Sequence, residues 1–132
     1  MIKYLLVMKM KECLLVGLGG GIGAILRYLL STIPLKSDFP FMTLFINILG
    51  AILIGMVVSL NMKQNILSPD TVLFLKTGVC GGFTTFSTFS LESVTLLEQH
   101  KPMIAISYMI LSLLLCLLGV FLGKSFIQQI KL

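Results

Sequence analysis

Charged residues are scarce in this chain, and their scarcity excludes an ordinary soluble domain. Only 11% of the 132 residues are Asp, Glu, Lys or Arg, whereas 57% are hydrophobic and the mean hydropathy is +1.05. A soluble domain carries about a quarter of its residues as charged side chains. The composition therefore predicts an integral membrane protein, and the length predicts one domain over residues 1–132.

Cysteines and clusters of basic residues are also few. The three cysteines, Cys13, Cys80 and Cys116, are scattered and form no C-x-x-C pair. This pattern argues against a disulfide framework or a zinc site, and we interpret them as small packing residues. The ten basic residues lie along the flanks of apolar stretches, where membrane orientation explains them better than nucleic-acid binding does.

What the chain does contain is four long hydrophobic segments, at about 13–33, 39–62, 71–97 and 103–123. Each is long enough to cross roughly 30 Å of hydrocarbon as a helix. We therefore expect an all-α, multi-pass protein with both termini on one side of the membrane. Six lysines flank the spans on that side and two on the other, which favours cytoplasmic termini and the cytoplasmic membrane; the six are Lys3, Lys9, Lys11, Lys63, Lys124 and Lys131.

The third segment is unsuited to an unbroken helix. Three glycines, Gly78, Gly81 and Gly82, precede a run of five hydroxyl side chains between Thr84 and Ser90. Irregular backbone at membrane depth is tolerated only where it is buried in protein or lines a polar cavity. We expect the third helix to be broken at its centre and to border a pathway for a small polar species.

Polar residues in the other spans leave two interpretations each. Arg27 either extends its side chain to the interface or draws an anion into a vestibule. Asn47, with Thr43 one turn before it, either packs helices by hydrogen bonding or donates within a polar pathway. Ser112 lies on a small-residue face of the fourth span, which serves packing or the pathway. The pairs Gly17/Gly21 and Gly19/Gly23 are interpreted as helix-packing motifs, not a nucleotide fingerprint.

Three motifs together resemble the Fluc (CrcB) family of fluoride channels. They are Gly-Gly-Phe-Thr-Thr-Phe-Ser-Thr-Phe-Ser at 81–90, Gly-Gly-Gly-Ile-Gly-Ala-Ile-Leu-Arg-Tyr at 19–28 and Thr-Leu-Phe-Ile-Asn-Ile-Leu-Gly at 43–50. The resemblance covers nearly the whole chain in the right order. It implies a passive, fluoride-selective channel, not an enzyme, that protects the cell from fluoride toxicity.

The resemblance also implies roles for particular residues. Phe86 and Phe89 match pore-lining phenylalanines, whose electropositive ring edges suit an anion. Arg27 matches an arginine near a pore entrance. Gly81 and Thr84 match helix-break residues whose carbonyls hold a structural Na⁺ at the interface of an antiparallel dimer. The polar positions of the fluoride path are matched by Thr43, Asn47, Ser87, Thr88, Ser90 and Ser112.

Several alternatives stay open at this point. The dimer is formed either by two copies of this chain or with an oppositely oriented paralogue. A proton-coupled small multidrug exporter also has four spans, but it is expected to carry an acid deep in its first span. Here that span has only Glu12 at its edge. A non-conducting accessory subunit is the remaining possibility.

Overall fold

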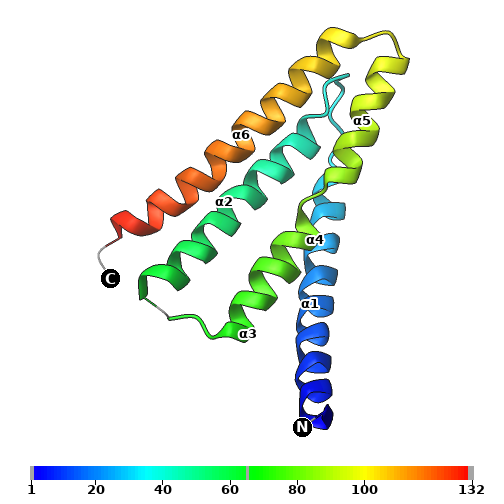
Figure 1. The fold of residues 1–132 in the computed structure, drawn as a ribbon. Coiled ribbons are helices and arrows are strands. Elements are labelled where there is room, and N and C mark those ends of the chain that lie inside the picture. Colours follow the sequence, from blue (N-terminus) through cyan, green and yellow to red (C-terminus); the bar gives the residue numbers. More distant parts are fainter. Residues whose placement is uncertain (1, 65, 131–132) are drawn as a thin grey trace.

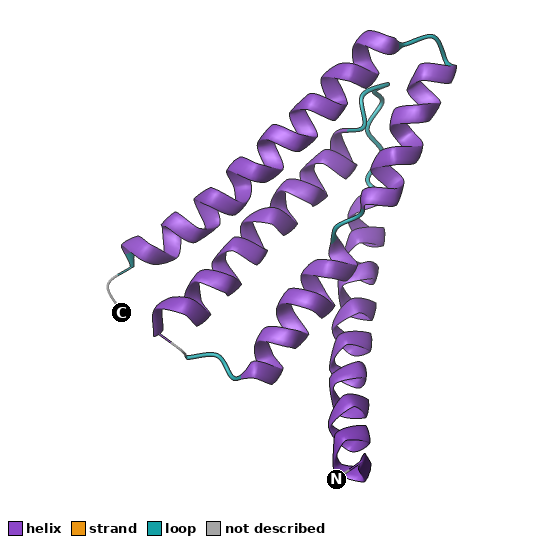
Figure 2. Cartoon of the chain, in the orientation of Figure 1, coloured by secondary structure: helices purple, strands orange, loops and turns teal. Residues whose placement is uncertain are grey.

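A computed structural model describes residues 2–64 and 66–130, and within these ranges all regular structure is helical (Figure 2). Lys131 therefore lies outside the described residues, as do the side chains of Lys3 and Lys63. The helical elements are α1 (Ile2–Ser31), α2 (Phe41–Gln64), α3 (Pro69–Val72), the π-helix η1 (Leu73–Cys80), α4 (Gly81–Phe83), α5 (Phe86–Glu98) and α6 (Pro102–Gln129).

Three helices among the described residues are long and apolar enough to cross a membrane. Their spans are Lys9–Ser31, Phe41–Met62 and Pro102–Gln129. The protein is therefore a multi-pass membrane protein. Helices α1 and α6 extend beyond the predicted spans. Lysines near their ends mark where the apolar span stops, but lysine favours a helix, so the helix itself continues. The region predicted as a third span is divided among α3, η1, α4 and α5.

Local sequence explains where several helices begin and end. Pro69 and Pro102 each occupy a first helical position, where a missing N–H costs nothing. Helix α5 ends in a Schellman motif around His100, whose φ of 58° is left-handed. Lys101 N–H donates to the Leu96 carbonyl at 2.9 Å and His100 N–H to that of Leu97 at 3.0 Å. This tight turn reverses the chain into α6.

Glycines bring the helices together in two pairs. In the first pair, α2 packs on α6: a Cβ on Gly55 would lie 2.4 Å from the Val120 carbonyl oxygen, and one on Gly123 would lie 2.2 Å from that of Ile52. In the second pair, α1 packs on η1 and α4, with Gly19 against Gly78. Such contacts leave no room for a side chain, so the backbones touch directly.

The two helix pairs are joined through α5. Buried side chains of α2, α5 and α6 form one cluster, consisting of Leu44, Leu96, Ala105 and Tyr108. Figure 1 shows α2 and α6 side by side. Helix α5 follows α4 and leads up to the connection with α6 (Figure 1). Both chain ends and the α2–α3 connection lie at one end of the molecule, which we call the terminal end (Figure 1).

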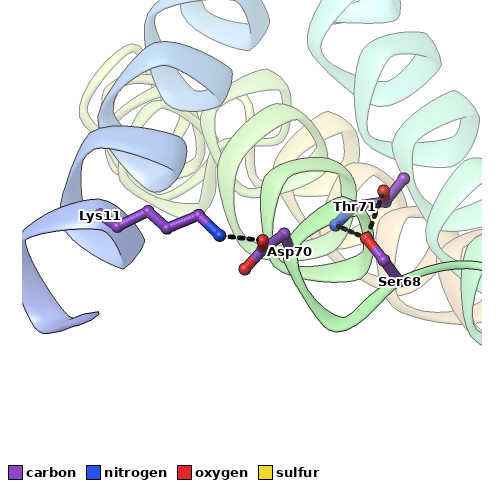
Figure 3. A network of polar contacts seen from close by, with 4 residues as sticks. All are labelled: Lys11, Ser68, Asp70 and Thr71. Atoms are coloured by element: carbon purple, nitrogen blue, oxygen red, sulfur yellow. Dashed lines mark hydrogen bonds and ion pairs between the residues drawn. The ribbon is translucent and has the colours of Figure 1, made fainter.

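An ion pair ties α1 to the beginning of α3 at the terminal end. Lys11 Nζ contacts the Asp70 carboxylate, and the neighbouring Ser68 hydroxyl caps α3 by accepting the Thr71 N–H at 3.2 Å (Figure 3). Asp70 lies in the first turn of α3, where a negative charge is favourable. Exposed pairs of this kind contribute about 0–1 kcal/mol, so this one orients α3 more than it stabilises the fold.

Candidate functional site

The helical run that begins at Pro69 stops at Phe83, and α5 starts at Phe86. Between them Thr84 and Thr85 are extended, with φ/ψ of −81°/156° and −146°/114°. Asn47 of α2 holds this interruption: its Nδ2 donates to the Thr85 carbonyl at 3.2 Å, and its Oδ1 accepts the Thr85 N–H at 2.8 Å. The amide thus accepts the Thr85 N–H, which would donate to the Gly81 carbonyl in a continuous helix, and adds a donor at the Thr85 carbonyl.

This arrangement supports the packing interpretation of Asn47 and leaves the other interpretation open. An amide NH₂ has two hydrogens, and the Thr85 carbonyl takes one. Asn47 also lines a groove that runs beside the interruption. The second hydrogen is thus left for another acceptor.

The groove has a volume of about 420 Å³ and is formed by α2, α6 and the segments on either side of the interruption. It brings together six of the predicted site residues, Asn47, Gly81, Thr84, Phe86, Phe89 and Ser112. None of its lining residues carries a formal charge; the others are Gly50, Ala51, Ile54, Cys80, Thr85, Leu113, Cys116, Leu117 and Val120.

Phe86 and Phe89 present neighbouring rings at one end of this groove. Their centroids are 5.5 Å apart with an interplanar angle of 42°, and Phe86 is 80% exposed. Phe89 in turn packs on Tyr108 of α6 at 5.1 Å. One ring is thus anchored in the core while the other stands open to the groove.

Ser112 is the most informative polar side chain of the groove. It is only 7% exposed, and among the described residues its Oγ is buried without a hydrogen-bond partner. A buried hydroxyl of this kind costs free energy unless something else satisfies it. Its position in the groove therefore marks a place where a polar ligand is expected.

The structure places the other predicted pathway hydroxyls away from the groove lining. Within the first turns of α5, Thr88 N–H donates to Thr85 Oγ1 at 3.2 Å, and Ser87 Oγ lies 3.3 Å from the same atom. Ser90 Oγ donates to the Phe86 carbonyl at 2.9 Å. These side chains cap or reinforce α5.

A hydrogen-bonded group that includes Thr43 lies behind Phe89. Thr43 Oγ1 and Tyr108 OH each donate to one carboxylate oxygen of Glu92, both at 2.7 Å. The sequence alone leaves the roles of Glu92 and Tyr108 open. The signal for them was present: an acid in an apolar segment requires donors, and Glu92 follows Phe89 by three residues on one helix face.

Arg27 is not among the residues that line the groove. It is half-buried, and its Nε donates to the Gly82 carbonyl at 3.3 Å. Its positive charge therefore lies against the carbonyl end of α4, where a cation is favourable.

The carbonyl groups of Gly81 and Thr84 fit a cation site. The amide that would donate to the Gly81 carbonyl in a helix is that of Thr85, which donates to Asn47 instead. Likewise Thr88 N–H, the helical donor for Thr84, donates to the Thr85 hydroxyl. Both oxygens thus lose their helical donors and lie on residues that line the groove. Hard cations such as Na⁺ prefer oxygen ligands of this kind.

Comparison with known proteins identifies the relatives of this chain. The profile of the family described as CrcB-like protein, camphor resistance (CrcB), matches residues 14–124. A fluoride-specific ion channel FluC of Ruminiclostridium cellulolyticum is 49% identical over 121 residues, which are 87% of this chain and 91% of that protein. The proteins of the same name from Clostridium perfringens (strain 13 / Type A) and Rhizobium meliloti are 44% and 42% identical, covering 88% and 90% of this chain and 93% and 98% of those proteins. The resemblance seen in the motifs is confirmed, and the chain belongs to the CrcB-like protein family.

Proposed function

We propose that this protein is a fluoride-selective channel that lets cytoplasmic fluoride leave the cell down its electrochemical gradient. Its relatives, to which it is similar over most of their length, bear the name fluoride-specific ion channel FluC. Within the chain, the observation that carries the proposal is the Ser112 hydroxyl, buried and unpartnered among the described residues in a groove that Phe86 and Phe89 also line. The groove offers hydrogen-bond donors to an anion, and its lining has no positively charged side chain that would hold the anion too tightly.

The chemistry of the groove suits a small, strongly hydrated anion. A fluoride ion that enters an apolar groove must exchange its water for other donors, because an unpaired buried charge is very costly. The Ser112 hydroxyl and the second hydrogen of the Asn47 amide are such donors. The electropositive edges of Phe86 and Phe89 complement the ion weakly, so it is held without being immobilised. The first N–H groups of α5 add a positive dipole end.

A structural Na⁺ bound by the carbonyls of Gly81 and Thr84 belongs to the same proposal. When bound, the ion supplies a fixed positive charge that satisfies carbonyl dipoles freed by the interruption. Asn47 and the Thr85 hydroxyl keep those carbonyls free by taking up the competing amides. The cation is thus a part of the fold at the groove and is not transported.

We further propose that the groove closes against a second subunit in an antiparallel dimer. The segments α3 to α5 then act together as the third, broken span, since irregular backbone at membrane depth must be covered by protein. The residues to be covered are Gly81, Thr84 and Phe86, of which Gly81 and Phe86 are exposed in the single chain. The partner is a second copy or an oppositely oriented paralogue, and the host membrane is the cytoplasmic one.

Purified protein in liposomes tests the proposal. With Na⁺ present and no proton gradient, fluoride efflux followed by a fluoride electrode should be rapid, and chloride efflux should stay at the level of empty liposomes. A proton-coupled exporter would need a proton gradient, and an accessory subunit would carry no ion. Absence of fluoride flux from intact dimers with Na⁺ present would refute the channel.

A further inference from the structure

Lys76 of η1 has no place in the function proposed so far, although it lies within the membrane-embedded part of the molecule. Its depth follows from the packing of η1 on α1. A Cβ on Gly19 would lie 2.6 Å from the Phe74 carbonyl oxygen and 3.0 Å from Gly78 Cα, so Gly19 is level with the turn that contains Lys76. Gly19 is seven residues beyond Glu12, the last charged residue before the apolar stretch of α1. At 1.5 Å per residue this is about 10 Å into the apolar region.

Lys76 precedes the groove lining by about one helical turn. A Cβ on Gly81, the first residue of α4, would lie 4.0 Å from the Lys76 carbonyl oxygen. Gly81 lines the groove, and the side chain of Lys76 is exposed. The ion pairs among the described residues, Lys11–Asp70 and Lys101–Asp38, do not involve Lys76. An exposed ammonium without an ion partner among the described residues is favourable at this depth only where water or another polar group reaches it.

A second lysine flanks the same end of the groove. On α6 the groove is lined by Leu113, Leu117 and Val120, and Lys124 follows Val120 by one turn on that face. Lys124 is exposed as well. From the groove, α6 and the run from α4 back to α3 both lead towards the terminal end (Figure 1), so Lys124 and Lys76 both follow the groove lining on that side.

We propose that Lys76, with Lys124, lines a water-filled entrance at the terminal end of the groove and concentrates fluoride there by its fixed positive charge. This inference rests on the proposed channel function and adds a determinant of its rate. A charged rim raises the local concentration of a counter-ion, and the effect weakens as salt screens it. The groove beyond these lysines has no charged lining residue, so the ion enters it without being held by a fixed positive charge.

Flux at two ionic strengths tests the proposal. We expect Lys76→Met to lower fluoride efflux from liposomes roughly 3- to 10-fold at about 10 mM ionic strength and less than about 2-fold at 1 M, with an impermeant salt making up the difference. Lys124→Met should act in the same direction but less, because it lies nearer the end of its helix. Lys76→Arg should retain the wild-type rate. Lys9→Met, which removes the same charge at the start of the α1 span, is the matched control.

Three outcomes separate the possible failures. A wild-type protein without fluoride flux refutes the channel and the entrance together. A conducting wild type with an unchanged Lys76→Met rate at low ionic strength refutes only the entrance. An equal loss at both ionic strengths also refutes it, because that result indicates a structural role for Lys76.

Water access to the position gives an independent measurement. In Lys76→Cys, a cationic methanethiosulfonate should restore the flux at low ionic strength and an anionic one should not. The unsubstituted protein, which retains Cys13, Cys80 and Cys116, controls for reaction elsewhere. If the introduced thiol does not react with either aqueous reagent, position 76 does not face water and the proposal is wrong.

Discussion

Replacing Gly23 by alanine should destabilise the protein, whereas the same change at Gly21 should not. A Cβ on Gly23 would lie 2.2 Å from the Val79 carbonyl oxygen and 2.7 Å from the Phe83 amide nitrogen. A Cβ on Gly21 would have nothing within 4 Å. Both positions are in the interior of α1, so both variants gain the same helix propensity, about 0.8–1 kcal/mol.

The loss of stability in Gly23→Ala follows from how far α1 must move to relieve the 2.2 Å contact with the Val79 carbonyl oxygen. A carbon–oxygen contact is comfortable at about 3.3 Å or more, so α1 must move roughly 1 Å away from η1 and α4. Neither neighbour can yield by rotating a side chain, because both are backbone atoms. Overpacking of this kind costs about 1–3 kcal/mol, and since the propensity gain is shared, this is the expected difference between the two variants.

Unfolding in mixed micelles measures that difference. Helicity is followed by circular dichroism while the mole fraction of sodium dodecyl sulfate is raised, and the free energy of unfolding of Gly23→Ala is compared with that of Gly21→Ala. We also expect Gly23→Ala to lower fluoride flux, because α4 carries the residues next to the groove. Equal stability of the two variants would show that α1 does not pack on α4 through Gly23.

The remaining predictions concern the groove. Phe86→Ile and Phe89→Ile should abolish or greatly slow fluoride flux while the dimer persists in cross-linking; wild-type rates in both would remove the rings from the pathway. Asn47→Leu should cost about 1–3 kcal/mol of stability by leaving the Thr85 amide unpaired, and should also impair flux. Ser112→Ala should leave micelle stability unchanged, since no protein partner among the described residues is lost, but slow fluoride flux. A marked loss of stability in this last variant would instead reveal a structural role for the hydroxyl.

The membrane character, three of the four predicted helical spans and the family could be predicted from the sequence because each depends on local information. Long apolar runs with few charges specify helices in a bilayer whatever surrounds them. The string from Gly81 to Ser90 identified the family directly, and it also marked the place where Thr84 and Thr85 leave the helix. Glycines followed by β-branched threonines weaken a helix at that position.

The tertiary structure decided which of the candidate polar groups are occupied and which are free. Sequence could not decide between packing and pathway for Asn47 and Ser112, or between the interface and a vestibule for Arg27, because each choice depends on partners distant along the chain. In the structure Asn47 holds Thr85, Arg27 holds Gly82, and Ser112 lacks a partner among the described residues. The same applies to the glycines: Gly19 and Gly23 meet backbone and Gly21 meets open space. Spacing along a helix defines a face, but only the neighbouring helix decides what that face contacts.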